Sequence, residues 1–305
     1  MINKIKVRLK KIYYQTRFHI LGILLPAPYK SEFEFFEDIR GNTYNDLSYK
    51  ETQLRSMVHQ LDKSLTLNKF KQMPLTVEKI TAYLGEVTKE PGHDTTLADW
   101  CRKLLHEYNS RCNGNPSTDK LITHFDNTGV ELLQNIIETR RSVRSYLPKP
   151  VDKESLNLIL QSGLWAPTGC NRQTVEYLVI EDKDDIRYCQ RIAGEGYPFP
   201  TEAPLAIVVL IDPRQYSLPS QRHMAYLEGG AAIQNILLTA HAMGFGACWL
   251  FWSGIKVSQS QFVKKFTLNP WLLPIAMICL GHPNILPVCR PERKTTLKSI
   301  HYPMR

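Results

Sequence analysis

Three arginines stand close together in one short segment of this 305-residue chain, Thr139-Arg140-Arg141-Ser142-Val143-Arg144-Ser145-Tyr146. A guanidinium group can hold phosphate oxygens through two parallel hydrogen bonds, and a serine hydroxyl adds a further donor. The segment is therefore a candidate phosphate-binding site. Taken alone, a basic segment of this kind is more often a solvated surface turn.

A second candidate segment, residues 166–173, reads Ala-Pro-Thr-Gly-Cys-Asn-Arg-Gln. Its Pro167, Gly169 and Asn171 favour a tight loop. The exposed amides and polar side chains of such a loop, Thr168 among them, could address the edge of a planar heterocycle. A plain helix-to-strand turn explains the same segment when it is considered alone.

Two further segments lie towards the C-terminus. A run of small residues, 229–240, predicts a buried helix, either at a subunit interface or in the core, and a Gly-Phe-Gly turn at 244–246 ends it. Without a Gly-x-Gly-x-x-Gly loop, no Rossmann dinucleotide site is predicted. Cations follow Gly281-His282-Pro283 at residues 290–294, where they either reach an anion or form a solvated tail. We identify no catalytic triad and no metal-ligand set, and interpret His282 as structural.

Alternating helices and strands must position these segments. The apolar patterns predict a helix over residues 153–164, strands over 177–180 and 205–211, a long helix over 224–243, and strands over 247–251 and 275–280. Strands this apolar are buried on both faces, which requires helices on each side of the sheet. The prediction is an α/β sandwich.

In their order and spacing, the four segments resemble the nitroreductase (flavin reductase) family over roughly residues 138–300. The shared features are Arg-Arg-Ser-x-Arg-x-Tyr, Ala-Pro-Thr-Gly-x-Asn-x-Gln, the small-residue helix with its Gly-x-Gly turn, and Gly-His-Pro followed by Arg-Lys. The resemblance implies an α+β fold, a nitroreductase-like sandwich with a central mixed sheet flanked by helices. It also implies a homodimer with FMN at the interface, NADH or NADPH as electron donor, and a small organic acceptor.

The resemblance assigns cofactor contacts to matching positions. The arginine-rich segment would hold the FMN phosphate, ribityl chain and pyrimidine edge, and Arg144 would stabilise the negative charge that a reduced flavin carries on its pyrimidine side. Arg293, beside Lys294, would close the phosphate site, the loop at 166–173 would come from the other subunit, and the strand end at Leu250 would pass near the reactive flavin nitrogen. The predicted cofactor-binding residues are Arg140, Arg141, Ser142, Arg144, Pro167, Thr168, Gly169, Asn171, Leu250 and Arg293.

Two departures from the family pattern concern the substrate. Gln173 is followed by Thr174, where the family usually has proline. Residues 194–200 are short where many members carry longer substrate-covering helices. The departures leave the choice of substrate, and turnover itself, open.

About 130 residues precede the region of resemblance, so we divide the chain into a mainly helical extension, 1–130, and an FMN-binding domain, 131–305. Apolar positions at helical spacing from Leu54 to Leu61 and from Leu97 to Tyr108 predict helices in the extension. The polar, turn-rich stretch 113–119 is the expected boundary. The role of the extension is open between docking to a partner, membrane or substrate and scaffolding.

Lys and Arg total 38 against 29 Asp and Glu, and this net charge of +9 attracts anions. The first 17 residues carry only cations, and this basic segment either packs on its own protein or makes peripheral contact with an anionic membrane. The apolar stretch at 20–25 is far shorter than the roughly 20 residues of a spanning helix. Seven cysteines without a Cys-x-x-Cys pair indicate reduced thiols, so we expect a cytoplasmic protein.

The expected function is FMN-dependent two-electron (hydride) transfer between NAD(P)H and a small organic acceptor. The alternative is a catalytically degenerate flavin-binding or scaffold protein associated with a membrane-linked polysaccharide biosynthetic complex. Bleaching of bound flavin by NAD(P)H would separate the two. Nucleic-acid binding is not predicted, because no interleaved aromatic and basic stripe is present.

Overall fold

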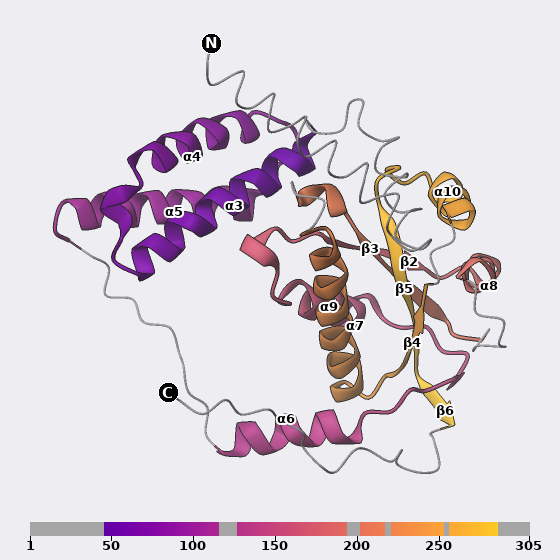
Figure 1. The fold of residues 1–305 in the computed structure, drawn as a ribbon. Coiled ribbons are helices and arrows are strands. Elements are labelled where there is room, and N and C mark those ends of the chain that lie inside the picture. Colours follow the sequence, from indigo (N-terminus) through magenta and orange to yellow (C-terminus); the bar gives the residue numbers. More distant parts are fainter. Residues whose placement is uncertain (1–45, 116–126, 194–201, 217–220, 253–255, 286–305) are drawn as a thin grey trace, which may run out of the picture.

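The computed structural model describes residues 46–115, 127–193, 202–216, 221–252 and 256–285, which form a helical unit beside a layered α+β domain (Figure 1). A four-stranded sheet lies at the centre of that domain, in the order β2 (Val175–Ile180), β3 (Leu205–Ile211), β5 (Leu273–Gly281) and β4 (Gly246–Phe251). Its strand pairs are all antiparallel. Within the described residues, the mixed character predicted for the sheet is limited to a parallel bridge between Ser142 and Ala247.

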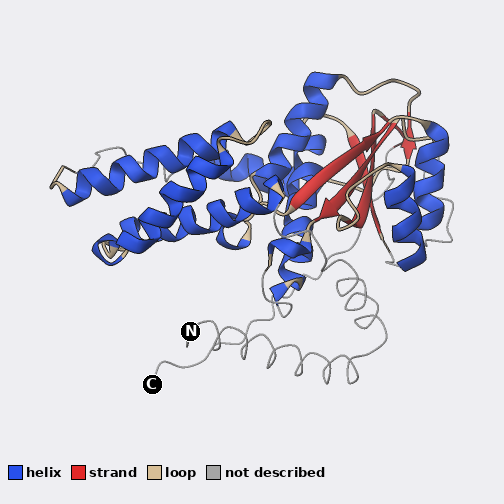
Figure 2. Cartoon of the chain, turned by 90° about the horizontal axis from the view of Figure 1, so that it is seen from above, coloured by secondary structure: helices blue, strands red, loops and turns tan. Residues whose placement is uncertain are grey.

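Every residue of β3 is buried, because the two faces of this strand pack against two different cores. Ala206, Val208 and Leu210 face one core and the residues between them face the other, as the two-residue period of a strand requires. The first face is covered by α8 (Lys183–Ile192) and α10 (Lys256–Lys265), and the second by α7 (Lys153–Leu164) and α9 (His223–Ala242) (Figure 2). The predicted sandwich with helices on both faces is confirmed.

The predicted elements of this domain are present, and the helix at 153–164 and the strand at 205–211 match α7 and β3 residue for residue. The other predicted ends lie within two residues of the observed ones. Sequence reasoning missed α8 and α10, because both are rich in charged and polar residues. For α8 a capping signal was present, since the Asp182 carboxylate accepts hydrogen bonds from the Asp184 and Asp185 amides at 2.9 Å.

Residues 46–115, the helical unit, contain α3 (Leu47–Thr66), the 3₁₀ turn η1 (Phe70–Gln72), α4 (Pro74–Val87) and α5 (Thr95–Cys112). Asp46 and Asp94 cap α3 and α5 by accepting hydrogen bonds from the Tyr49 and Leu97 amides at 2.9 and 3.1 Å. The unit has its own apolar core. Its predicted helical character is confirmed, whereas the division of the chain near residue 130 stays a prediction.

The basic segment predicted at residues 1–17 lies outside the described residues, as does most of the expected boundary stretch. Among the helices of the described ranges, none combines the length and the apolar character that crossing a membrane requires. Peripheral contact of the basic segment with a membrane stays a prediction.

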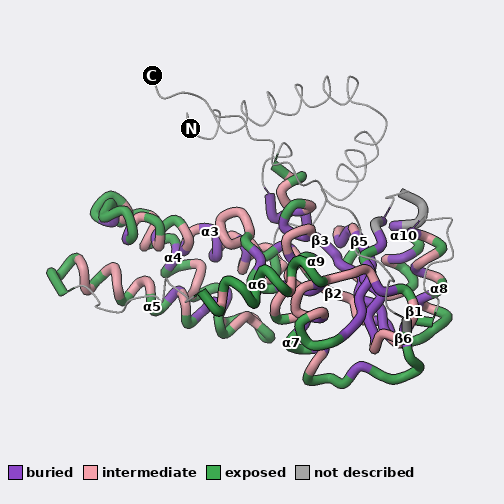
Figure 3. The backbone as a smooth tube through the Cα atoms, turned by 90° about the horizontal axis from the view of Figure 1, so that it is seen from below, coloured by how far each residue is buried: buried purple, intermediate pink, exposed green. Residues whose placement is uncertain are grey.

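The helix α6 (Asn127–Thr139) leads directly into the arginine-rich segment and has no buried residue (Figure 3). Its apolar side chains Val130, Leu132, Leu133 and Ile137 are all exposed. An amphipathic helix normally buries its apolar face. Over the described residues, most of the apolar face of α6 is uncovered, although Ile136 is half-buried and the helix contacts α9.

Candidate functional site

The arginine-rich segment follows α6 and is fixed to the sheet through its backbone. The Val143 amide donates to the Ala247 carbonyl of β4 at 3.0 Å, and β1 (Ser145–Tyr146) pairs with β6 (Pro283–Ile285). The buried Tyr146 hydroxyl donates to the carbonyls of Val143 and Cys279 at 2.6 and 3.1 Å, and burial raises the pKa of Tyr146. Tyr146 therefore positions this segment, a role that the sequence analysis did not assign.

The arginine side chains of this segment lie outside the core. Arg144 is exposed, and Arg140 and Arg141 are half-buried. Arg141 donates to the carbonyls of Arg140 and Glu138 at 2.6 and 2.8 Å, and Arg144 donates to the Ser142 carbonyl at 3.3 Å. Ionised phosphate oxygens are stronger acceptors than backbone carbonyls, so these two guanidinium groups can turn to an anion.

His241, at the C-terminal end of α9, responds to the positive potential of the same region. Its Nε2 lies 2.8 Å from Thr139 Oγ1. The pKa of His241 is lowered, first by burial and then by the charges of Arg140 and Arg141. The positive potential that disfavours protonation of His241 also favours a bound anion beside these arginines.

The second predicted segment forms a tight 3₁₀ turn, η2 (Gly169–Asn171), shortly before β2. Cys170, Asn171 and Gln173 have φ angles of 54°, 53° and 54°, in the left-handed region that residues other than glycine rarely adopt. Pro167 is exposed, and the Thr168 hydroxyl accepts a hydrogen bond from the Gln173 amide at 3.1 Å. The surroundings of this turn must impose its conformation.

Glu228 of α9 supplies much of that restraint, and the sequence analysis missed it. Its side chain is 3% exposed, and the carboxylate accepts hydrogen bonds from the Gly169 amide and the Thr174 hydroxyl, both at 2.6 Å, and from the Tyr216 hydroxyl. Burial, followed by the Glu228 carboxylate, raises the pKa of Tyr216. The signal in the sequence was a single carboxylate beside the small residues of the helix.

Leu250 and its neighbour Trp249 point to opposite sides of β4. Leu250 is 1% exposed and packs in the core beneath α8 and α10, so its side chain cannot contact a cofactor. At the start of the same strand, a Cβ on Gly246 would lie 2.7 Å from Val143 Cγ1. A glycine at this position therefore lets the arginine-rich segment approach β4.

The structure brings the arginine-rich segment and β4 together, but it places the loop at 167–171 at the other end of α9. Glu228 contacts the loop and His241 contacts the end of α6 beside the arginines. These two residues are 241 − 228 = 13 positions apart on α9, or about 20 Å along the helix axis. A single chain therefore does not close a compact site from both segments. Arg293 and residues 194–200 lie outside the described residues.

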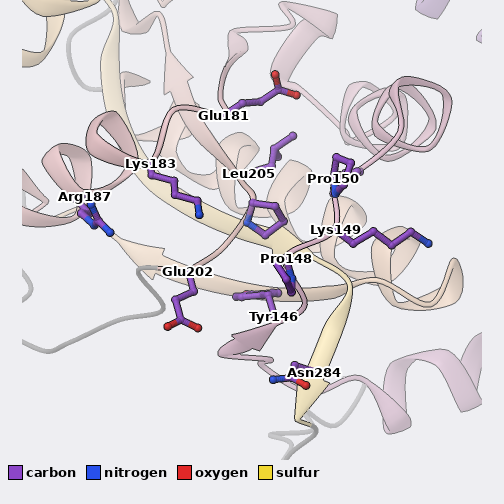
Figure 4. Close-up of a pocket in the computed structure, with 12 residues that line it drawn as sticks. Tyr146, Pro148, Lys149, Pro150, Glu181, Lys183, Arg187, Glu202, Leu205 and Asn284 are labelled. Carbon is purple, nitrogen blue, oxygen red and sulfur yellow. The ribbon is translucent and has the colours of Figure 1, made fainter.

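A separate cavity of about 670 Å³ opens beside β1 and β6 (Figure 4). Its lining carries the cations Lys149, Lys183 and Arg187 together with the carboxylates of Glu181 and Glu202. None of the predicted cofactor-binding residues lines it. We assign this mixed-charge cavity no ligand.

Two other sequence interpretations concern histidine and metal ligands. The His282 ring packs against Phe245 with their centroids 4.8 Å apart, which is a structural contact. Over the ranges that the structure describes, no group of His, Cys, Asp and Glu side chains could hold a metal ion.

The nitroreductase family model matches residues 137–198 and 189–282 of this chain. An Archaeoglobus fulgidus protein, provisionally named NADH dehydrogenase/NAD(P)H nitroreductase, is 33% identical over 149 residues, which cover 49% of this chain and 84% of that protein. The NADPH-flavin oxidoreductase of Vibrio harveyi is 26% identical over 172 residues, covering 52% and 70%. A crystal structure of a provisionally named nitroreductase with FMN from Desulfovibrio desulfuricans is 33% identical, with coverage of 55% and 97% and a TM-score of 0.45.

Proposed function

This chain belongs to the nitroreductase family, and we propose that its residues 131–305 form an FMN-dependent oxidoreductase domain. It transfers two electrons, as hydride, between NADH or NADPH and a small organic acceptor. The names of relatives as NAD(P)H nitroreductase and NADPH-flavin oxidoreductase support this activity. The observation that carries the proposal is the arginine-rich segment, anchored to β4 with its guanidinium groups outside the core.

The phosphate of FMN fits the surroundings of Arg140 and Arg141. After burial, their charges are the next cause that lowers the pKa of His241, and the same positive potential would favour a dianionic phosphate. The Ser142 hydroxyl offers a further hydrogen bond. Arg293, outside the described residues, would complete the phosphate contacts.

The isoalloxazine ring would lie along β4, with the strand end at Leu250 near the reactive flavin nitrogen and Arg144 near the pyrimidine edge. FMN supplies the hydride chemistry itself. The task of this chain is to orient the ring and to favour negative charge on its pyrimidine side, which the exposed guanidinium of Arg144 can do. We assign no acid–base residue to the reaction.

The proposed enzyme is a homodimer with FMN at the interface. The separation of about 20 Å between the arginine-rich segment and the loop at 167–171 is bridged when the loop comes from the partner subunit. A single chain also exposes apolar surface of the kind that marks interfaces. The large exposed apolar residues on or beside α6, α7 and α9 are Val130, Leu132, Leu133, Ile137, Leu158, Leu164, Trp165, Leu227 and Met243.

An absorption spectrum of the purified protein, taken before and after anaerobic NADH or NADPH, tests the proposal. We expect flavin bands that bleach with the donor, and an Arg140→Ala variant that loses them. Arg102→Ala, which removes an exposed arginine of the helical unit, is the matched control and should keep them. Colourless protein that takes up no added FMN would overturn the cofactor assignment, and flavin that does not bleach would favour the scaffold alternative.

A further inference from the structure

The helical unit contacts the α+β domain at two short turns, one of which, η2, is part of the predicted flavin loop. Its helix α3 contacts both η2 and η3 (Pro213–Gln215). Thr52 of α3 is 2% exposed, and its hydroxyl donates to the Arg172 carbonyl at 3.4 Å. Arg172 directly follows η2, so this bond joins the unit to the end of the loop.

A second link joins the N-terminus of α3 to η3. The Arg214 guanidinium, 1% exposed, donates to the Asp46 carboxylate at 2.7 Å and to Asp212 at 2.6 Å. The Gln215 amide lies 3.4 Å from the Ser48 hydroxyl. Asp46 thus caps α3 and pairs with a buried cation of the other domain at the same time.

The residues of η3 are also connected to the loop at 167–171. Tyr216, the residue after η3, shares the Glu228 carboxylate with the Gly169 amide. The Arg172 guanidinium lies 4.7 Å from the centre of the Tyr216 ring and donates to the Gly169 carbonyl at 2.8 Å. The loop is therefore held between α3 on one side and α9 on the other.

The backbone conformation of the loop explains why it needs these contacts. Three residues of the loop region, Cys170, Asn171 and Gln173, have positive φ angles. Each costs conformational free energy that the surrounding contacts must offset. With fewer contacts the loop would populate other conformations, and a ligand that needs the native one would bind more weakly.

We propose that the helical unit is an intramolecular brace, whose residues Asp46 and Thr52 fix the loop at 167–171, together with Arg172 that follows it, in the conformation that binds flavin. The identity of the ligand as flavin rests on the proposed function, whereas the bracing of the loop by the helical unit does not. It gives the extension a role in the flavin site to which this loop contributes across the proposed dimer: FMN affinity depends on two positioning residues that are not among the predicted flavin contacts.

The test compares two double variants of the full chain. Asp46→Asn/Thr52→Val removes both links while asparagine keeps the helix cap. Asp94→Asn/Thr81→Val is matched to it, because Asp94 caps α5 and pairs with Arg55 at 2.5 Å, and the Thr81 hydroxyl donates to the Val77 carbonyl at 2.9 Å, all inside the helical unit. Hydrogen exchange of the Gly169, Asn171 and Arg172 amides is measured without FMN, and the FMN dissociation constant is then measured by titration.

We expect exchange of these loop amides to quicken about fivefold in the first variant, and FMN to bind about fivefold more weakly, with the control near wild type. Unchanged loop exchange would overturn the brace. Faster exchange with unchanged FMN affinity would overturn its role in flavin binding. Wild-type protein that takes up no FMN would refute the proposed function and with it the flavin role, while the exchange comparison would still decide the brace. A circular dichroism melt establishes that both variants are folded.

Discussion

Replacing Glu228 tests the network that holds the loop at 167–171. The carboxylate is buried and accepts from three donors, the Gly169 amide and the hydroxyls of Thr174 and Tyr216. In Glu228→Leu all three donors lose their acceptor, at similar side-chain volume. A donor left unsatisfied costs about 1–3 kcal/mol, and the two hydroxyls can partly reorient, so we expect a loss of about 3–5 kcal/mol in the free energy of unfolding.

Glu228→Gln separates hydrogen bonding from charge. The carbonyl oxygen of the glutamine side chain remains as an acceptor for the Gly169 amide and the Tyr216 hydroxyl, and the Thr174 hydroxyl can rotate to accept from the new NH₂ group. The expected loss is therefore only about 1–2 kcal/mol, that of charge assistance. Both variants are measured by urea denaturation beside Glu131→Gln, which changes an exposed carboxylate of α6 and should alter stability by less than about 0.5 kcal/mol.

A Glu228→Leu protein as stable as the wild type would refute this reasoning, because the three donors would then have found other acceptors. Equal losses in the Leu and Gln variants would also contradict it, since the charge alone would then carry the effect. Non-additive losses when Glu228→Gln is combined with Tyr216→Phe would confirm that the two side chains act together.

Three further predictions follow from the arginine-rich segment. Burial and the arginines lower the pKa of His241 below that of an unfolded histidine, about 6.5, so the unfolded chain takes up this proton first and the contribution of His241 to stability, intact above pH 6.5, is lost as the pH falls below it. In urea denaturation from pH 7.5 to 5.5, the free energy of unfolding should therefore decrease less in His241→Asn than in the wild type. An equal decrease would contradict the assignment. Gly246→Ala should destabilise the protein by about 1–3 kcal/mol because the new Cβ meets Val143, whereas Gly85→Ala, which has open space in α4, should be neutral or stabilise by about 0.5–1 kcal/mol. Denaturation midpoints that rank the two variants the other way would refute the close packing of Gly246 against Val143. Tyr146→Phe removes the donor to the Val143 carbonyl, so we expect a loss of about 1–2 kcal/mol and weaker FMN binding in a fluorescence titration, and wild-type values for both would show that the hydroxyl does not position the segment.

The sequence predicted the main elements of the α+β domain because their patterns are strong. The strand β3 is apolar throughout and α7 has apolar residues at helical spacing after a capping Asp152, so local rules fixed both ends. The helices α8 and α10 have only a few apolar positions, Phe262 among them, and tertiary packing on the sheet makes them helical. Propensity alone does not reveal such elements.

The sequence by itself determined the chemistry that the site can offer: guanidinium groups and a hydroxyl in one segment, a polar loop in a second, and a run of small residues in a third. It could not determine how these segments lie in space. Only the tertiary structure decided that the two segments stand at opposite ends of α9, that Glu228 tethers the loop, and that α3 of the helical unit packs against it. The physical reason is that residue types set which interactions are available, whereas distances between segments far apart in the chain are set by the packing of whole helices and sheets.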